Sequence, residues 1–169
     1  MKVFTVIGYS NSGKTETITR IIKELVGRGH VVHAVKSVHI EGFTIETEGK
    51  DSWRFWQAGA KTTAIRADNE TTIIVRKSMN AKELLPFFQG DYVIFEGFHD
   101  EVTLPKILCA TDPEELEERF NESVFAISGR IADTMTSYKG VKIINGLTNI
   151  RELVDLIEVK AIESEKVQR

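Results

Sequence analysis

The chain has 169 residues, of which 41% are hydrophobic and 28% charged, a balance typical of one globular domain. Its formal net charge of −3 disfavours a nucleic-acid partner, because proteins that hold a nucleic-acid backbone usually carry a basic excess. Cys109 is the single cysteine, so we expect no internal disulfide. The sequence shows neither a secretory signal nor an apolar stretch of the ~20 residues that span a membrane, so we expect a cytoplasmic protein with no membrane partner.

The first elements in chain order predict a strand, a loop and a helix. Residues 2–7 are almost continuously apolar, as in a buried central strand. Gly8–Gly13 is a loop of small residues. The apolar residues after it recur at helical spacing: Ile18, Ile21, Ile22, Leu25 and Val26. Gly27 and Gly29 are expected to end this helix.

Strands and helices alternate along the rest of the chain. We predict strands at residues 30–36, 62–66, 71–76, 91–95, 106–110, 123–128 and 141–144. We predict one helix at residues 51–60, capped by Asp51 or Ser52, and another at residues 80–89. Two more helices are predicted, one that begins after the cap residue Asp112 and one that begins after a cap at Thr148 or Asn149. Residues 37–50 are expected to form a functional loop, and the polar end at 163–169 is expected to fray.

The loop between the first strand and the first helix matches the phosphate-binding pattern G-x-x-x-x-G-K-[ST] over Gly8–Thr15. Small residues let backbone N–H groups turn inward around an anion, and the positive end of the next helix points at the same place. Lys14 adds a full charge, and the Thr15 hydroxyl is a suitable Mg²⁺ ligand. We therefore predict phosphate binding by Asn11, Ser12, Gly13, Lys14, Thr15 and Glu16.

The second half of such a site is an acidic residue at the end of a neighbouring parallel strand, where the strand at 91–95 delivers Glu96. Its carboxylate would hold a magnesium-bound water or the ion; a solvated residue at a strand end is the alternative. Lys14 and Glu96 are the candidate catalytic residues, and Thr15 and Glu96 the candidate metal ligands. The whole pattern predicts an α/β fold, the three-layer fold of P-loop NTPases, with helices on both faces of a mostly parallel sheet in one domain, 1–169.

Four sequence blocks resemble the molybdopterin-guanine dinucleotide biosynthesis protein B (MobB) family. They are the loop Gly8–Thr15, Lys36-Ser37-Val38-His39, Gly49-Lys50-Asp51-Ser52 running into Ala58-Gly59-Ala60, and Phe95-Glu96-Gly97-Phe98. Their order and spacing cover about the first 100 residues. The second block departs from the family pattern Lys-His-x-His-His, because Ser37 replaces the first histidine, which puts histidine-dependent contacts to metal, pterin or partner in doubt.

The resemblance implies a protein that binds GTP with Mg²⁺, forms a homodimer and is at most a slow GTPase. It implies an accessory role beside the guanylyltransferase that joins GMP to molybdopterin, with molybdopterin itself as a further candidate partner. It also favours Gly49, Lys50 and Asp51 as an anion-binding helix start, for which an ordinary capped helix is the alternative. Lys36, at a strand end, is either a phosphate neighbour or a surface lysine.

Guanine preference rests on the resemblance alone, because the sequence lacks the Asn-Lys-x-Asp element with which GTPases usually read guanine. Asp112 is a candidate base reader, although its helix-cap role explains it, and Ser128-Gly129 could offer N–H groups to a base edge. Two other functions stay open: a P-loop small-molecule kinase or ATP-dependent ligase, and a vestigial fold that serves as a scaffold. The kinase is disfavoured because Gly97–Phe125 holds only Lys106 and Arg119 as basic residues for an arginine-bearing lid.

Overall fold

The computed structural model describes residues 1–167 and contains two compact units. The first unit combines Met1–Ser37 with the chain from Asn80 onward, and the second unit is Val38–Met79. The prediction of a single domain over residues 1–169 stays a prediction. No helix in the described part of the chain has the length and apolarity needed to cross a bilayer.

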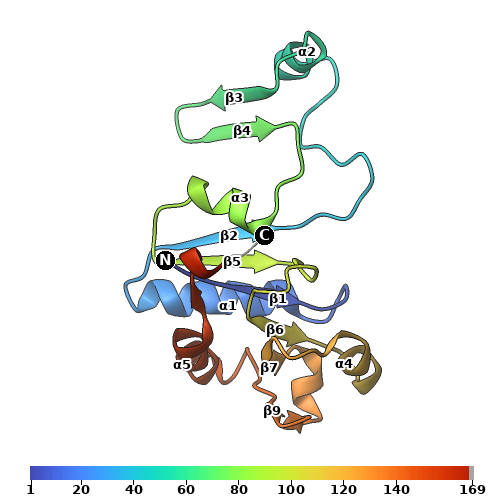
Figure 1. Cartoon of the computed structure of the whole chain (residues 1–169), viewed down its shortest axis with the longest axis vertical. Coiled ribbons are helices and arrows are strands. Elements are labelled where there is room, and N and C mark those ends of the chain that lie inside the picture. The colour runs from blue at the N-terminus through green and yellow to red at the C-terminus, as the bar shows by residue number, and fades with distance from the viewer. Residues whose placement is uncertain (168–169) are drawn as a thin grey trace. The chain divides into compact units, whose positions relative to one another are not determined.

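The first unit is built on a mostly parallel sheet with the strand order β2-β5-β1-β6-β7 (Figure 1). Its strands are β1 (Lys2–Ile7), β2 (Val32–Lys36), β5 (Tyr92–Glu96), β6 (Lys106–Cys109) and β7 (Val124–Ser128). A short strand, β10 (Ile162–Glu163), runs antiparallel to the start of β1. The mostly parallel sheet predicted from the sequence is therefore confirmed, as is the parallel pairing of the strand that carries Glu96 with the first strand.

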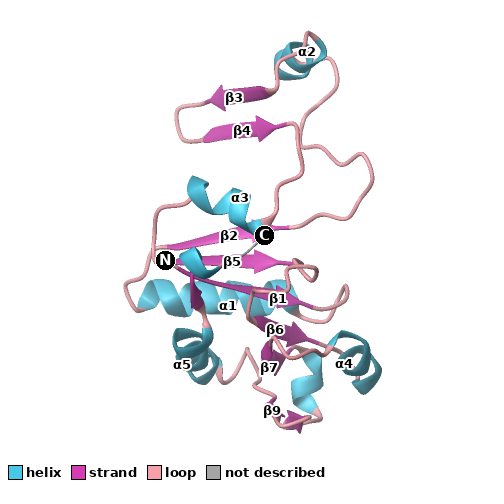
Figure 2. Cartoon of the chain, viewed as in Figure 1, coloured by secondary structure: helices cyan, strands magenta, loops and turns pink. Residues whose placement is uncertain are grey.

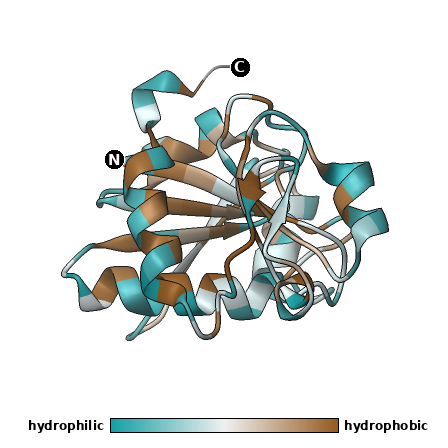
Figure 3. Cartoon of the chain, turned by 90° about the horizontal axis from the view of Figure 1, so that it is seen from below, coloured by the Kyte–Doolittle hydropathy of each residue, from teal (hydrophilic) through white to brown (hydrophobic). Residues whose placement is uncertain are grey.

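Helices cover both faces of this sheet because its strands are apolar on both sides (Figures 2 and 3). On one face, Phe4 and Val6 share a buried cluster with α1 (Lys14–Gly27) and α5 (Ile150–Lys160). On the other face, Val3 packs with α3 (Ala81–Leu84), and Ile7 packs with α4 (Pro113–Arg119). The three-layer α/β architecture predicted from the sequence is confirmed.

The second unit contains α2 (Asp51–Gln57) and a hairpin of β3 (Thr62–Arg66) and β4 (Thr71–Val75). The Ala67 N–H donates to the Glu70 carbonyl at 2.9 Å, which closes the turn between the two strands. Helix α2 buries none of its residues, and the Arg76 guanidinium lies 4.3 Å from the centre of the Trp56 ring. Arg76 also forms an ion pair with Glu46, whose side chain is 2% exposed.

Several predicted boundaries differ from the structure. The helix expected at 80–89 is α3 followed by a 3₁₀ helix, Leu85–Phe87, because Pro86 has no N–H to continue an α-helix. The N-cap residue of α2 is Lys50, and not Asp51 or Ser52 as predicted. The strand expected at 141–144 is shorter: β9 (Val141–Lys142) pairs with β8 (Ser137–Tyr138), and Ile143 adds one bridge to Ile127.

The chain after α5 is more ordered than the predicted frayed end at 163–169. Glu163 pairs with Lys2 in β10, and a 3₁₀ helix follows at Ser164–Lys166. Val167 is 1% exposed and belongs to the cluster around Val93 and Phe95. The polar pattern missed this because Val167 is the only buried residue from 163 to 167. Residues 168 and 169 lie outside the described residues.

Candidate functional site

The loop between β1 and α1 is a tight turn of backbone that side chains would obstruct. Gly8 has φ of 143°, and a Cβ there would lie 2.0 Å from the Cys109 carbonyl oxygen of neighbouring strand β6. Asn11 and Gly13 also have positive φ, 65° and 94°. These left-handed conformations fold the loop back on itself and bring it to the start of α1.

The start of α1 is free to receive an anion. Gly13 is the N-cap residue, and a glycine has no side chain that could accept a hydrogen bond from this end of the helix. The first-turn N–H groups of a helix have no intrahelical partners, and the helix dipole makes this end positive. Ser12 is fully buried in the loop, and its Oγ has no hydrogen-bond partner among the described residues. An unpartnered buried hydroxyl beside free N–H groups fits a group rich in acceptor oxygens, such as a phosphate.

Lys14 supplies the positive charge of the loop. Its ammonium donates to the Tyr9 carbonyl oxygen at 2.5 Å, which folds the side chain over the loop. Burial lowers the pKa of Lys14 below its usual value, and the nearby Glu96 carboxylate partly opposes that shift. A partly desolvated ammonium gains more from an anionic partner than one in bulk water does.

Glu96 ends β5 directly beside the loop, because β5 is the neighbour of both β1 and β2. In the sheet register, Glu96 lies opposite Val6 on one side and Lys36 on the other. The Lys36 ammonium donates to Glu96 Oε1 at 2.6 Å, and the Glu96 side chain is 14% exposed while that of Lys36 is 61% exposed. The structure thus brings Lys36, Glu96 and the phosphate loop to one edge of the sheet.

The candidate metal ligands are oxygen donors at this same edge. Thr15 is exposed on the first turn of α1, one residue after Lys14. No group of three or more His, Cys, Asp or Glu side chains in the described chain is arranged to hold a metal. Thr15 and Glu96 are two oxygen donors, so an ion that they held would need further ligands from water and phosphate oxygens, as Mg²⁺ commonly takes.

Gly129, at the end of β7, lies against the loop from the other side. The Arg130 N–H donates to the Ser12 carbonyl at 3.3 Å, and a Cβ on Gly129 would lie 2.3 Å from that same oxygen. Next to this contact is a cavity of about 240 Å³ that includes Asp133 and Asn145. Sequence reasoning named Ser128-Gly129 but missed Asp133, the last residue of a 3₁₀ helix, and Asn145, which lies outside any helix or strand; neither residue belongs to a sequence motif.

The remaining predicted residues divide between the two units. Gly49, Lys50 and Asp51 belong to the second unit, where Gly49 has φ of 83° and Asp51 is 3.8 Å from Arg54. Their anion-binding role stays a prediction. Asp112 in the first unit accepts a hydrogen bond from the Glu115 N–H at 3.0 Å, so its helix-cap role is confirmed.

Neither basic residue between Gly97 and Phe125 forms part of a lid. Lys106 is 1% exposed, and its ammonium donates to the Glu101 and Leu104 carbonyls and to Ser123 Oγ. Burial lowers the pKa of Lys106, with Glu101 and Asp100 opposing the shift. The Arg119 guanidinium lies 4.3 Å from the centre of the Tyr9 ring. Both side chains therefore have structural partners.

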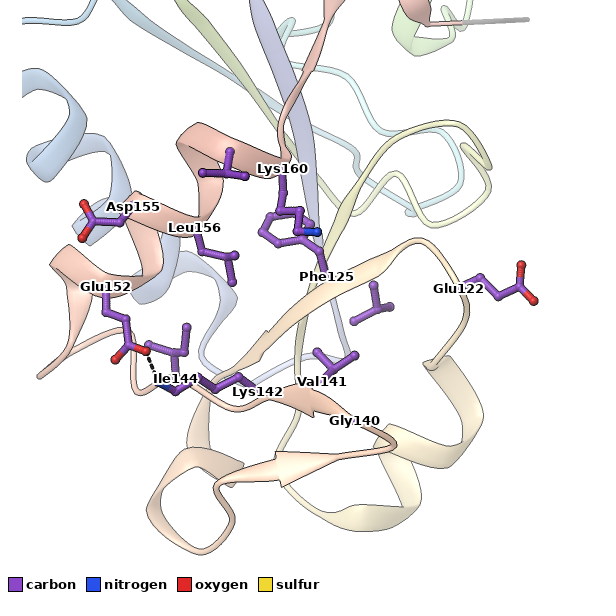
Figure 4. Close-up of a pocket in the computed structure, with 12 residues that line it drawn as sticks. Glu122, Phe125, Gly140, Val141, Lys142, Ile144, Glu152, Asp155, Leu156 and Lys160 are labelled. Atoms are coloured by element: carbon purple, nitrogen blue, oxygen red, sulfur yellow. Dashed lines mark hydrogen bonds and ion pairs between the residues drawn. The ribbon is translucent and has the colours of Figure 1, made fainter.

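A larger cavity of about 660 Å³ lies elsewhere, between β7, β9 and α5 (Figure 4). Phe125, Val141 and Leu156 give it apolar walls, and an ion pair between Lys142 and Glu152 lies at one side. It includes no residue of the phosphate loop. Its size alone does not make it the functional site, because it lacks the converging N–H groups and the buried charge of the loop.

Comparison with known proteins gives a consistent set of relatives. The family model of MobB, molybdopterin guanine dinucleotide synthesis protein B, matches residues 3–130. A Bacillus subtilis (strain 168) protein named as a probable molybdopterin-guanine dinucleotide biosynthesis adapter is 30% identical over 146 residues, covering 83% of each chain. The Haemophilus influenzae adapter protein of the same name is 35% identical over 108 residues, covering 61% of this chain and 60% of that protein. The crystal structure of Bacillus subtilis MobB matches with a TM-score of 0.77 and 28% identity, covering 96% of this chain and 99% of that one.

Proposed function

Because this chain belongs to the MobB family, molybdopterin guanine dinucleotide synthesis protein B, we propose that it is a GTP-binding adapter in the biosynthesis of the molybdenum cofactor. Its accessory role is to assist the conversion of molybdopterin to molybdopterin guanine dinucleotide, the process for which its relatives are named. The partner that this role requires is the guanylyltransferase that transfers the guanine nucleotide. Molybdopterin itself is a further candidate ligand.

One observation carries the nucleotide-binding part of this proposal: the open, positively charged cradle formed by the loop and the start of α1. The N–H groups from Gly13 to Glu16 would bind phosphate oxygens, and the orphaned Ser12 Oγ would gain its missing partner. Lys14 would turn from the Tyr9 carbonyl to the β and γ phosphates. Asn11 takes the positive φ that lets the loop close around them.

Thr15 and Glu96 would hold Mg²⁺, directly or through its waters, and the ion would offset phosphate charge. Lys36 is paired with Glu96 and so holds this carboxylate in place at the sheet edge. Lys14 and Glu96 are then the residues placed to support hydrolysis. Gly49, Lys50 and Asp51 are proposed as an anion-binding helix start within the second unit.

Hydrolysis of GTP is expected to be slow, with a turnover below roughly 1 s⁻¹, the low end for efficient phosphoryl-transfer enzymes. The segment after Glu96, Gly97–Leu104, contains neither an arginine nor a glutamine that could orient an attacking water. Lys36 contacts Glu96 through its ammonium group, which donates hydrogen bonds and cannot accept a proton from an attacking water. A faster turnover would contradict the assignment as an adapter.

We also propose that the protein forms a homodimer and is located in the cytoplasm.

Calorimetric titration with GTP and with ATP, each with Mg²⁺, separates the three candidate functions. Clear GTP preference with little turnover supports the adapter. ATP preference with fast hydrolysis on addition of a metabolite supports a kinase or ligase, which the structural roles of Lys106 and Arg119 disfavour. Binding of neither nucleotide would support a scaffold and reject the proposal.

A further inference from the structure

The cavity of about 240 Å³ beside the phosphate loop is lined in part by glycines. Gly13, Gly129 and Gly146 line it, and each is closely packed underneath. A Cβ on Gly129 would lie 2.3 Å from the Ser12 carbonyl oxygen, and one on Gly146 would lie 3.0 Å from Ser128 Oγ and from Thr17 Cγ2. The three glycines leave a surface free of side chains next to the loop, which suits a flat ring.

The polar groups of this cavity are held in place by a short hydrogen-bond network. Asn145 Oδ1 accepts from the N–H groups of Leu147 at 2.9 Å and Thr148 at 3.3 Å, which fixes the orientation of its amide. The same amide donates through Nδ2 to Asp133 Oδ1 at 3.1 Å. The Asp133 carboxylate is thus positioned by Asn145, and this bond uses only one lone pair of Oδ1, so both carboxylate oxygens can still accept from a ligand.

The other walls of the cavity add an apolar contact and a second carboxylate, Glu16, which differs from Asp133 in being paired with a cation, Arg20, and not with a neutral amide. Leu147 is 49% exposed and offers an apolar edge beside the network. Glu16 also lines the cavity, but its Oε1 accepts from Arg20 Nε at 3.1 Å. Asp133 is therefore the carboxylate best placed to meet a ligand here.

The edges of the purine bases differ in a way that a carboxylate distinguishes. Guanine presents two neighbouring donors, N1–H and the 2-amino group, whereas adenine presents an acceptor at N1 and no amino group at C2. A carboxylate only accepts hydrogen bonds, so it pairs with guanine and repels the N1 lone pair of adenine. Inosine lacks the 2-amino donor, and xanthine carries an oxygen in its place.

We propose that this cavity is the base-binding site and that Asp133, positioned by Asn145, selects guanine. The inference rests on the proposed function, because it takes the triphosphate to lie in the loop that contributes Gly13 to the cavity. With phosphates bound at Gly13–Thr15, the attached nucleoside reaches a cavity that begins at the same residue. Guanine preference would then come from an element unlike Asn-Lys-x-Asp, which this sequence lacks.

The test compares GTP, ITP, XTP and ATP by calorimetry with Mg²⁺, using the full chain and the variants Asp133→Asn and Asp133→Ala. The wild type should prefer GTP over the other three. Asp133→Asn should weaken GTP binding by about 10-fold or more, the effect of a lost bidentate base contact, and should improve XTP relative to GTP, because an amide N–H can donate to the xanthine oxygen. Asp133→Ala should bind GTP and ITP equally.

Glu165→Gln is the matched control, since it neutralises an exposed carboxylate in the 3₁₀ helix that follows β10, at the opposite end of β1 from the loop. Its nucleotide preference should equal that of the wild type. Unchanged selectivity in both Asp133 variants, with thermal melting showing that they fold, would overturn the base-site assignment while GTP binding stands. If wild type and Lys14→Ala bind GTP equally, or neither binds it, the proposed function itself falls, and this inference falls with it.

Discussion

Lys14 is the residue on which phosphate binding depends most, because it brings the only side-chain ammonium into the Gly8–Thr15 loop. Replacing Lys14 with alanine should weaken GTP binding at least about 10-fold, since a hydrogen bond from a charged group contributes ~1.5–3 kcal/mol. Lys23→Ala is the control, because it removes the same charge from an exposed position on the same helix. Calorimetry should show affinity lost in the first variant and kept in the second; equal affinities would reject the loop as the phosphate site.

The pKa of Lys14 predicts a link between nucleotide binding and protons. Burial lowers this pKa below 10.5 in the free protein, so the ammonium begins to lose its proton at a lower pH than an ordinary lysine does. A bound triphosphate stabilises the ammonium and raises the pKa again. Between the lowered and the raised pKa, binding must therefore take up protons, and affinity should fall as pH rises through that window.

Titrations in buffers of different ionisation enthalpy measure this proton uptake. The wild type should show an uptake that grows as pH increases toward the pKa of free Lys14. Lys14→Ala should lose that component. An identical uptake in both proteins would mean that another group carries the proton.

At this residue scale, the sequence could predict the groups that belong to a motif. Asn11–Thr15 follow from the loop pattern, and Glu96 follows from its place at the end of a buried strand; the structure places all of them at one sheet edge. Asp133 and Asn145 could not be predicted, because their meeting depends on how the chain after β7 turns back to the loop. No local pattern in the sequence encodes that turn.

Among the elements, the connection from β7 to the following 3₁₀ helix at Arg130–Asp133 is the one that most constrains the loop. Gly129→Ala should destabilise the fold by about 1–3 kcal/mol, because its φ of 86° disfavours a Cβ and that Cβ would lie 2.3 Å from the Ser12 carbonyl. GTP affinity should fall as well, since Ser12 has to shift. Chemical denaturation and calorimetry measure the two effects.

Gly27→Ala is the matched control for this glycine, because a Cβ at Gly27 meets no atom within 4 Å. Alanine there, in the last turn of α1, should stabilise the protein by roughly 0.5–1 kcal/mol and leave GTP binding unchanged. If Gly129→Ala lowers and Gly27→Ala raises the free energy of unfolding, close packing of Gly129 against the loop accounts for the destabilisation. Equal effects of the two substitutions would contradict that explanation.

Element types were predictable where apolar periodicity was strong, as in β1, α1 and α5. The first and last residues of helices and strands were less predictable, because they depend on contacts with residues distant in the sequence. Pro86 divides the helix predicted at 80–89, and pairing of β10 with β1 orders a segment whose own composition is polar. Tertiary contacts therefore override local pattern at these places.

On the scale of the whole molecule, Cys109 reports global unfolding, since it lies fully buried at the end of β6, an interior strand of the sheet. Burial raises the pKa of its thiol to about 12, so the folded protein keeps a proton that the unfolded chain loses near 9.0. The free energy of unfolding should therefore decrease as pH rises from about 9 toward 12. At pH 8, a thiol reagent should label Cys109 only as fast as the protein opens, and rapid labelling of the folded protein would contradict the burial.

The fold class of the whole molecule was predictable, because alternating strands and helices with strands apolar on both faces leave few arrangements. The strand order β2-β5-β1-β6-β7 was only partly predictable. The pairing of β5 with β1 followed from the expected position of Glu96 at the end of a strand next to the first strand. The separation of Val38–Met79 as a compact unit was not predicted. Weak periodicity over residues 37–50 indicated a loop and gave no sign of where a unit begins.

The most direct test of phosphate binding by this loop is a crystal structure of the protein with Mg²⁺ and a GTP analogue that resists hydrolysis. The account predicts β and γ phosphates against the N–H groups of Gly13–Thr15, with the Lys14 ammonium moved from the Tyr9 carbonyl onto them. Ser12 Oγ should gain its hydrogen-bond partner in the same complex. A nucleotide bound elsewhere, with Lys14 still bonded to Tyr9, would contradict it.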